Sequence, residues 1–427
     1  MRGFEDPLYC GLALQAQGLG YWQKRILWGA TGAYTIYYFC RVNISIAIPL
    51  MQKSLGASKT ELGFIASGLQ ITYGLGKFLN GVMGDRQNPR YFMATGLMLS
   101  GLANLAFSQS TSIRLLAVVW ALNGWFQSMG FPAGAKLLSH YYKPSEYGRS
   151  WTIFGCSHQV GAYIILVAGG YLGLLGWRNI FAAPGVVAVI ASAGVVWVLR
   201  DIPYKNKELT EIAPAPQRPA LWAGLSRIVR NRFIWAVAIG NLFLYIVRYG
   251  LLTWSASFLI SNRGMSVVAA GWMLGVFELA GLFGGLSAGW ISDLKSHGRR
   301  GPVMTVFMLL LSAAIVCLWL APAGNRPVIG LALAACGFFV YGPLMLVSVA
   351  AAGYVGPELA GSASGLPGLF GYIGATLAGA GLGATAEHAG WLAVFVVLIS
   401  AALISTACFA FTAWAPPPSG IQHDTIP

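Results

Sequence analysis

This chain has few charged residues, and the acidic ones are the scarcest. Asp, Glu, Lys and Arg together make up 9% of its 427 residues, whereas an average soluble chain contains about 25%. A soluble protein of this length could not cover its surface with so few charges. The hydrophobic residues, 56% of the chain, come in repeated blocks of roughly 20 or more, long enough to cross the apolar core of a bilayer as helices. The composition therefore excludes a soluble globular protein and predicts an all-α membrane protein.

Motifs that would indicate an enzyme or a redox protein are also missing from the sequence. No two of the six cysteines form a C-x-x-C pair, and five of them lie within apolar blocks, so we interpret them as small packing residues. No nucleophile–base pair, metal-ligand cluster or phosphate-binding glycine loop stands out. We therefore expect no catalytic residue, no metal and no cofactor. Because no basic region precedes a short apolar core and a cleavage site, we expect the first span to remain in the protein.

Basic residues outnumber acidic ones by 27 to 13, which gives a formal net charge of +14. Most of them lie in short connections between apolar blocks, and no basic run with interleaved aromatics occurs outside these blocks, so we expect no nucleic-acid partner. With both termini placed in the cytoplasm, the connections carry seventeen Lys and Arg residues on the inner side and six on the outer side. The positive-inside rule therefore predicts cytoplasmic termini for a multi-pass protein whose partner is the lipid bilayer.

About twelve apolar blocks are candidate membrane spans, and one long connection divides them into two sets of six. This connection is rich in charge and contains Pro203, Pro214, Pro216 and Pro219, as a linker between two bundles would. We predict a cytoplasmic segment (1–25), a six-helix bundle (26–199), a linker (200–232), a second six-helix bundle (233–414) and a cytoplasmic tail (415–427). The spans are expected at 26–50, 61–83, 91–109, 113–139, 148–172, 177–199, 233–258, 267–291, 302–321, 327–353, 360–385 and 391–414.

A short motif that recurs at an offset of 208 residues supports two related halves. The second and eighth spans both end in a glycine, an aspartate four residues later and a basic cluster: Gly81, Asp85, Arg86 and Arg90 in the first case, and Gly289, Asp293, Arg299 and Arg300 in the second. Each motif alone is an ordinary polar turn, but their matched positions resemble the parallel repeats of the major facilitator superfamily. We predict that these charged residues brace the cytoplasmic ends of the two halves and separate during inward opening.

Four basic residues lie within the predicted spans: Arg41, Lys77, Lys136 and Arg248. A basic residue at the centre of a span costs about 2.5–3.5 kcal/mol on insertion scales. Lys136 is near the inner end of its span and can extend its ammonium group to the membrane surface, so we assign it a structural role. The other three lie deeper, and Glu278 is the one acidic residue convincingly within a span. This excess of buried positive charge predicts a site for an anion, and Glu278 is expected to act in the conformational change.

Phosphate fits this excess better than a carboxylate does. Arg41 and Arg248 lie 207 residues apart, in the first and seventh spans, and so occupy equivalent positions in the two predicted halves. Two planar guanidinium groups can donate to several oxygens of one phosphoryl group. A phosphate monoester offers three oxygens and a charge of about −1.5 to −2, whereas a carboxylate offers two oxygens and a single charge. Two arginines with Lys77 therefore predict a phosphate-bearing substrate.

Tyrosines at helical spacing accompany the buried cations. Tyr34 and Tyr38 lie seven and three residues before Arg41, Tyr73 lies four residues before Lys77, and Tyr245 lies three residues before Arg248. Residues at these spacings share one face of a helix. A phenol can donate to a phosphate oxygen without adding charge, although any single tyrosine also suits ordinary packing between helices. His158, in the fifth span, has two interpretations that stay open. It forms a neutral hydrogen bond between helices, or it is protonated when a phosphate dianion arrives.

Seven motifs in a fixed order carry a family resemblance. They are Tyr-Thr-Ile-Tyr-Tyr-Phe-Cys-Arg-Val-Asn at 34–43, Gly-Lys-Phe at 76–78, Cys-Ser-His-Gln-Val-Gly at 156–161, Tyr-Ile-Val-Arg-Tyr-Gly-Leu-Leu-Thr-Trp at 245–254, Glu-Leu-Ala-Gly at 278–281, Tyr-Gly-Pro at 341–343 and Leu-Phe-Gly-Tyr-Ile-Gly at 369–374. Along nearly its whole length the chain thereby resembles the organophosphate:phosphate antiporter family of the major facilitator superfamily. This resemblance implies twelve transmembrane helices in two pseudo-symmetric six-helix bundles, in a bacterial inner membrane.

The resemblance also implies roles for individual residues. Arg41 and Arg248 match the substrate-clamping arginines of the family, and Lys77 and His158 match its cavity lysine and histidine. Five tyrosines match residues that line the cavity: Tyr34, Tyr38, Tyr73, Tyr341 and Tyr372. We expect a monomer that exchanges an organophosphate for inorganic phosphate by rocker-switch alternating access.

Two departures leave the organic part of the substrate open. Val42 stands where glycerol-3-phosphate exchangers have a lysine, and 361–385 lacks the charged residues that hexose-phosphate exchangers carry there. Two other functions remain as alternatives. One is a membrane receptor of transporter-like fold that binds a sugar phosphate, and the other is a transporter of another organic anion, coupled to protons through His158 or Glu278.

Overall fold

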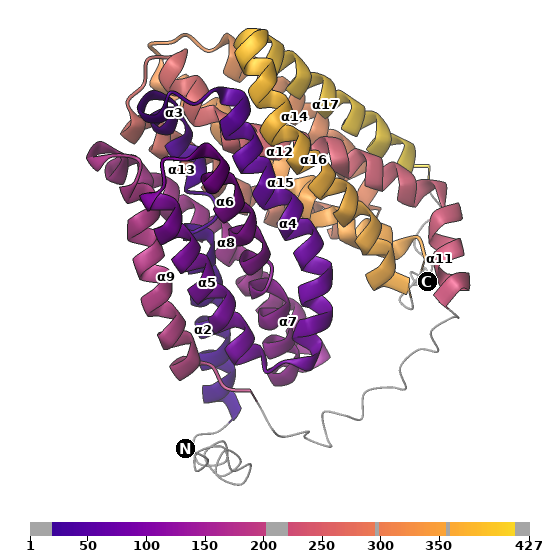
Figure 1. Cartoon of the computed structure of the whole chain (residues 1–427). Helices are drawn as coiled ribbons and strands as arrows, with labels where there is room; N and C mark the ends of the chain where they lie inside the picture. The colour runs from indigo at the N-terminus through magenta and orange to yellow at the C-terminus, as the bar shows by residue number, and fades with distance from the viewer. Residues whose placement is uncertain (1–18, 202–220, 295–298, 356–358, 415–427) are drawn as a thin grey trace. The chain divides into compact units, whose positions relative to one another are not determined.

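The computed structural model of the chain describes residues 19–201, 221–294, 299–355 and 359–414. Within these residues the secondary structure is entirely helical (Figure 1). The long helices are α2 (Leu19–Phe39), α3 (Ile44–Leu55), α4 (Lys59–Arg86), α5 (Pro89–Gln109), α6 (Ile113–Gln127), α7 (Gly130–Tyr141), α8 (Pro144–Leu172), α9 (Asn179–Val198), α12 (Arg232–Ser261), α13 (Val267–Leu294), α14 (Arg300–Leu320), α15 (Arg326–Gly353), α16 (Ala360–His388) and α17 (Gly390–Thr412). A 3-10 turn, η1 (Gly173–Leu175), follows α8, and a shorter helix, α11 (Leu221–Arg230), precedes α12.

Nine of the described helices are long and apolar enough to cross a membrane, namely α5, α8, α9 and α12 to α17. The three other predicted spans also have helical counterparts. The second corresponds to α4, whereas the first and the fourth are each interrupted.

The first and fourth spans, expected as continuous helices over 26–50 and 113–139, are each broken into two helices. The first breaks between α2 and α3, at residues 40–43, and the fourth between α6 and α7, at Ser128 and Met129. Pro132, in the first turn of α7, cannot donate a backbone N–H to the carbonyl four residues before it, which favours the second break. At the first break Asn43 accepts the N–H of Ile44 with its side chain (3.1 Å). A short polar side chain of this kind competes with the helical hydrogen bond.

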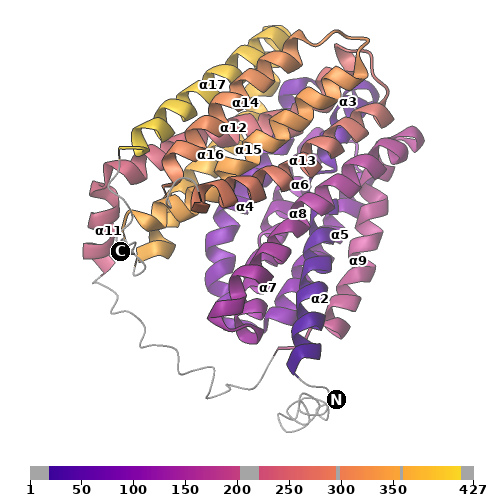
Figure 2. The ribbon, with the colours of Figure 1, turned by 180° about the vertical axis from the view of Figure 1, so that it is seen from behind.

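The chain groups into two compact units. The first comprises Met1–Ile44, Ile71–Ile165 and Leu175–Ala215, and the second comprises Ser45–Gln70, Leu166–Leu174 and Pro216–Pro427. In the first unit α9 packs against α5 and α2, and these three helices lie side by side in both views (Figures 1 and 2). In the second unit α13 packs against α15, α12 against α16, and α14 against α17.

Glycines permit the close packing of α13 on α15. A Cβ atom at Gly284 would overlap the backbone of Phe338, and one at Gly337 would overlap the backbone of Phe277. The two helices therefore approach at backbone distance, as small residues allow in membrane proteins. Three further glycines of α13 are spaced four residues apart, at positions 281, 285 and 289. A Cβ atom at either of the first two would meet residues of α15, whereas one at position 289 would meet nothing within 4 Å.

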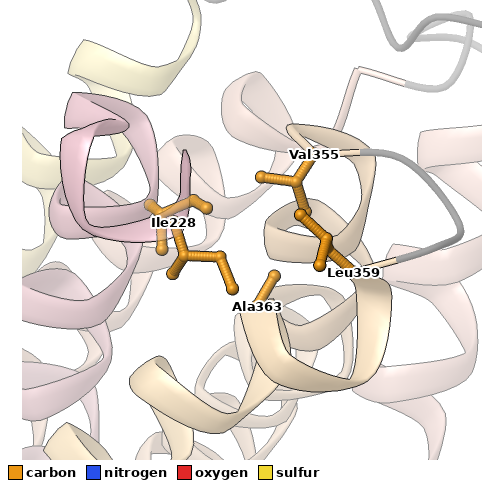
Figure 3. Packing of buried hydrophobic residues seen from close by; sticks show 5 residues of the cluster. Ile228, Val355, Leu359 and Ala363 are labelled. Carbon is orange, nitrogen blue, oxygen red and sulfur yellow. The ribbon is translucent and has the colours of Figure 1, made fainter. Parts of the chain in front are cut away.

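The end of the predicted linker 200–232 is helical and packs within the second unit. Ile228 of α11 is 3% exposed and lies in an apolar cluster with Ile234, Val355, Leu359 and Ala363 (Figure 3). Asn231 donates from Nδ2 to the carbonyl of Tyr354 (3.3 Å). The start of α12 is thereby attached to the connection that follows α15. Residues 202–220, the tail 415–427 and residues 1–18 of the predicted N-terminal segment lie outside the described residues, and the division into two bundles at this linker stays a prediction.

Candidate functional site

Arg41 lies in the break between α2 and α3, and it is buried, with 5% of its surface exposed. Its guanidinium carbon is 3.8 Å from the ring centre of Tyr73 on α4 and 5.3 Å from that of Tyr38 on α2. Tyr34 packs one turn before Tyr38, with its ring centre at 5.6 Å. Aromatic faces attract a weakly hydrated guanidinium group, which lowers the cost of burying its charge. Arg41 was expected on the same helical face as the two tyrosines of α2, but it belongs to the turn that follows this helix.

His158 joins this cluster from α8. Its ring centre is 5.5 Å from that of Tyr38, and its Nδ1 contacts the backbone carbonyl of Gly155. Because a carbonyl only accepts hydrogen bonds, Nδ1 carries the proton in this contact, which both the neutral Nδ1–H ring and the protonated ring provide. The structure therefore places His158 beside Tyr38, which flanks Arg41, and its role in binding stays a prediction.

Lys77, one turn after Tyr73 on α4, lies at the edge of the same cluster. Its side chain is exposed in the isolated chain, and its ammonium nitrogen is 5.7 Å from the ring centre of Phe131 on α7. Phe131 in turn packs 5.8 Å from Tyr34 and 5.1 Å from Trp151. Phe131 and Trp151 were missed from the sequence. The spacing of Trp151, Phe154 and His158 along one helix is the signal that could have found Trp151.

A second cluster surrounds Arg248 on α12. This arginine is 5% exposed, and its guanidinium carbon is 4.9 Å from the ring centres of both Tyr249 and Tyr341 and 6.0 Å from that of Tyr245. Tyr372 of α16 extends the cluster, with its ring centre 5.9 Å from that of Tyr245. Tyr249 was not predicted, although it directly follows the arginine in the sequence.

Tyr341 connects Arg248 to Glu278 by two hydrogen bonds. Arg248 donates from Nη2 to the Tyr341 hydroxyl (3.1 Å), and this hydroxyl donates to Oε2 of Glu278 (2.6 Å). Glu278 is 1% exposed, and within the described residues its Oε1 atom has no hydrogen-bond partner. The two arginines therefore differ in their surroundings: Arg41 is stacked between aromatic rings, whereas Arg248 shares a buried network with a carboxyl group.

The charged residues predicted to brace the cytoplasmic ends of the two halves lie near helix ends. Asp293 at the end of α13 and Arg300 at the start of α14 form an ion pair of 3.0 Å, and Arg299 is the N-cap residue of α14. In the first unit Asp85 and Arg86 are exposed at the end of α4, and the guanidinium carbon of Arg90 is 4.8 Å from the ring centre of Tyr91. Their role in bracing the two halves stays a prediction.

Lys136 has the structural role that its position suggested. Its ammonium group donates to the backbone carbonyls of Gly84, Asp85 and Gln87 at 3.1, 2.9 and 2.8 Å. These carbonyls lie in the last turn of α4 and directly after it, where the end of a helix leaves carbonyls without intrahelical donors. A cation at this position is also favoured by the helix dipole.

A methyl group added at Gly281 is expected to disturb the second cluster. The Cβ atom of Gly281→Ala would overlap the ring of Tyr341, and overpacking of this kind costs about 1–3 kcal/mol. Gly289→Ala on the same helix is the matched control, because its Cβ would meet nothing within 4 Å and alanine favours a helix by roughly 0.8–1 kcal/mol over glycine. Thermal unfolding in detergent should show a lower midpoint for the first variant only, and equal midpoints would contradict the packing of Tyr341 on Gly281.

Comparisons with known proteins identify the family of this chain. Residues 30–379 match the family model described as Major Facilitator Superfamily. A "Probable hexose phosphate transport protein" of Chlamydia pneumoniae is 38% identical over 412 residues, which cover 91% of this chain and 90% of that protein. This chain belongs to the organophosphate:phosphate antiporter family of the major facilitator superfamily. Its membership confirms the resemblance on which the residue roles were predicted.

Other members of the family cover the chain to a similar extent. The "Glycerol-3-phosphate transporter" of Bacillus subtilis (strain 168) is 35% identical, with 89% of each chain covered. The "Membrane sensor protein UhpC" of Escherichia coli (strain K12) is 34% identical, with 90% of each chain covered. The family is one of membrane proteins named for transport and sensing, and none of these names is that of an enzyme.

A solved structure agrees on the fold. The bacterial homologue of the human lysosomal transporter Spinster, in its inward-facing and occupied conformation, superimposes with a TM-score of 0.77 over 92% of this chain and 97% of that chain. The identity of 15% supports the fold alone. The chain is thus an all-α, multi-pass membrane protein with the twelve-helix, two-bundle fold of the superfamily, as predicted.

Proposed function

We propose that this protein transports organophosphates across the bacterial inner membrane in exchange for inorganic phosphate, by rocker-switch alternating access. Arg41 and Arg248 would donate to the phosphoryl oxygens, with Lys77 and His158 adding positive charge and the neighbouring tyrosines adding neutral donors. Both termini would lie in the cytoplasm, and the functional unit would be a monomer. The relatives named as hexose phosphate and glycerol-3-phosphate transporters support the substrate class.

The observation that carries this proposal is the balance of buried charge. Among the described residues, the buried charged side chains are Arg41, Arg248 and Glu278. A buried charge is costly unless a partner compensates for it. Two buried guanidinium groups with one buried carboxyl group match a dianionic guest better than a neutral or cationic one. Each guanidinium group also lies among phenols that can donate to additional oxygens.

Exchange follows from the same charge balance. Without a bound anion, positive charge in both clusters would oppose the occluded state that a rocker-switch carrier passes through. A bound phosphoryl group would offset that charge and favour closure by its differential affinity for the closed state. A carrier of this kind moves between its two open states mainly when loaded, which favours exchange over net leak.

Counterflow in proteoliposomes tests the proposal. Vesicles loaded with inorganic phosphate are expected to take up labelled phosphate, and external glucose-6-phosphate, glycerol-3-phosphate and other phosphate esters should compete to different degrees that rank the substrates. A carboxylate of similar size should compete poorly, because it offers fewer oxygens and less charge. Uptake of a carboxylate that phosphate fails to inhibit would contradict the proposal and favour another organic anion as the substrate.

A membrane receptor for sugar phosphates is the second candidate function. The observation in its favour is the 34% identity to the relative named a membrane sensor protein. The two functions share a binding site and differ in turnover. Saturable phosphate-ester binding to the purified protein, together with no counterflow by the same preparation in vesicles, would identify a receptor.

A further inference from the structure

The break in the first span leaves backbone groups that must find partners within the protein, because the apolar core of a bilayer offers none. Two carbonyls at the end of α2 are satisfied by side-chain amides from neighbouring helices. The carbonyl of Cys40 accepts hydrogen bonds from Nδ2 of Asn104 on α5 (3.2 Å) and Nδ2 of Asn123 on α6 (2.7 Å). The carbonyl of Tyr37 accepts a hydrogen bond from Nε2 of Gln127, the last residue of α6 (2.9 Å).

Asn43 completes the set from within the break itself. Its Oδ1 accepts the backbone N–H of Ile44 (3.1 Å), and its Nδ2 donates to Oδ1 of Asn104 (2.8 Å) and to the carbonyl of Ile180 on α9 (3.1 Å). We call Asn43, Asn104, Asn123 and Gln127 the amide scaffold. All four side chains are at most 1% exposed, so their hydrogen bonds are made out of reach of solvent.

The scaffold occupies the two groups that a continuous helix would join to each other. In an unbroken α-helix the N–H of Ile44 would donate to the carbonyl of Cys40, four residues before it. Here the carbonyl accepts from Asn104 and Asn123, and the N–H donates to Asn43. The amides thus replace the hydrogen bond that would straighten the span at Arg41.

Tyr37 holds the last turn of α2 in place beside the scaffold. Its ring is fully buried, and its hydroxyl donates to the carbonyl of Met93 on α5 (2.7 Å). A Cβ atom at Gly130 would lie 3.0 Å from this ring, so the start of α7 packs closely against it. Gln127 and Gly130 flank the break in the fourth span, so the last turn of α2 contacts the chain on both sides of that break.

We propose that the amide scaffold positions Arg41, holding the first span open so that its guanidinium group lies between Tyr38 and Tyr73 and can donate to a phosphoryl group. This inference rests on the proposed function for the nature of the ligand. The scaffold residues act through Arg41 and need no contact with the substrate. Loss of Asn123 leaves the Cys40 carbonyl with one amide donor in place of two, which favours the helical bond from the N–H of Ile44. Loss of Gln127 leaves the Tyr37 carbonyl with the N–H of Cys40 alone, which favours the helical bond from the N–H of Arg41. Either change would move Arg41 out of its aromatic site.

Binding of inorganic phosphate to the purified full-length protein, measured by calorimetry in detergent, tests this role. Asn123→Leu and Gln127→Met remove a donor at similar side-chain size and should each weaken phosphate binding by about tenfold, the equivalent of one hydrogen bond to the bound anion. Asn80→Leu is the matched control. Asn80 is a buried amide of the same unit that donates to Trp125 (3.1 Å) and Ser128 (2.6 Å) at the other break, and its replacement should lower the unfolding midpoint while leaving the affinity within about twofold.

A double-mutant cycle separates positioning from general loosening. Adding Asn123→Leu to Arg41→Lys should weaken binding by less than about twofold, because the scaffold acts through the arginine that is already altered. An equal loss in both backgrounds would overturn the proposal, as would native affinity in a folded Asn123→Leu protein. Should that variant fail to fold, Gln127→Met decides the question in the same cycle.

The Cys40 thiol provides a readout that does not depend on the ligand. This thiol is fully buried and donates to the carbonyl of Pro184 (3.5 Å). N-ethylmaleimide should modify Cys40 about tenfold faster in Asn123→Leu and Gln127→Met than in Asn80→Leu, measured by mass spectrometry of its peptide, since local opening of the break controls its exposure. Equal rates would show that the scaffold does not hold the break. A native protein that binds no phosphate would instead contradict the proposed function, while the labelling rates still decide whether the amides hold the break.

Discussion

Arg41→Ala is expected to abolish phosphate exchange in proteoliposomes while the protein still folds. The substitution removes a planar pair of donors from the phosphoryl group, and each hydrogen bond to a charged group contributes about 1.5–3 kcal/mol. Two such bonds correspond to a loss of roughly a hundredfold or more in affinity. Arg41→Lys should have an intermediate effect, because it keeps the charge and loses the fork of donors.

Arg178→Ala is the control for this experiment. Arg178 is also stacked on an aromatic ring, with its guanidinium carbon 4.7 Å from the ring centre of Trp177, but it is the N-cap residue of α9, and the ring it stacks on is not one of the tyrosines around Arg41. Its removal should leave exchange unchanged. Exchange at the native rate in a folded Arg41→Ala protein would exclude this arginine from the binding site and with it the proposed clamp.

Arg248→Ala is expected to remove both exchange and much of the stability of the protein. Tyr341 connects this guanidinium group to the buried carboxyl of Glu278, and removal of one partner of a buried charged pair costs about 3–5 kcal/mol because the other charge is left uncompensated. Chemical unfolding in detergent measures the loss. The same substitution at Arg41 should cost less stability, because the partners identified for that arginine are tyrosines.

Adding Glu278→Gln to Arg248→Ala separates the two effects. The second substitution removes the uncompensated charge and keeps the shape of the side chain, so most of the lost stability should return. Exchange should stay absent, because the donor to the phosphoryl group is still missing. Exchange restored to the native rate in the double variant would show that Arg248 acts only by compensating Glu278, and that it does not bind the substrate.

Several features of the site could be predicted from sequence because they depend on residue type and order alone. Arg41 and Arg248 are conspicuous in apolar spans, since charge is costly there, and the motifs around them identify the family. Tyr38, Tyr245 and Tyr341 follow from spacing or from the family motifs, and the structure gathers them around the two arginines.

Other features could not be predicted because they depend on contacts between distant parts of the chain. The amides of Asn104, Asn123 and Gln127 are uncharged and cost little on a hydropathy scale, so nothing in the local sequence connects them to position 40. Likewise, the bond from Tyr341 to Glu278 requires α13 and α15 to approach at Gly281, where a Cβ would overlap the tyrosine ring.

By itself the sequence determined the membrane environment, the helical class, the family and the two buried arginines, because apolar length and charge are properties of each segment alone. The exposure of Lys77, expected to be buried with them, was not determined in this way. Only the tertiary structure decided that the first span breaks at Arg41 and that the two arginines have different surroundings. The physical reason is that a helix within a membrane is interrupted where side chains from other helices satisfy its backbone groups. Here the packing of the whole unit brings those side chains, the amides of Asn104, Asn123 and Gln127, to the end of α2.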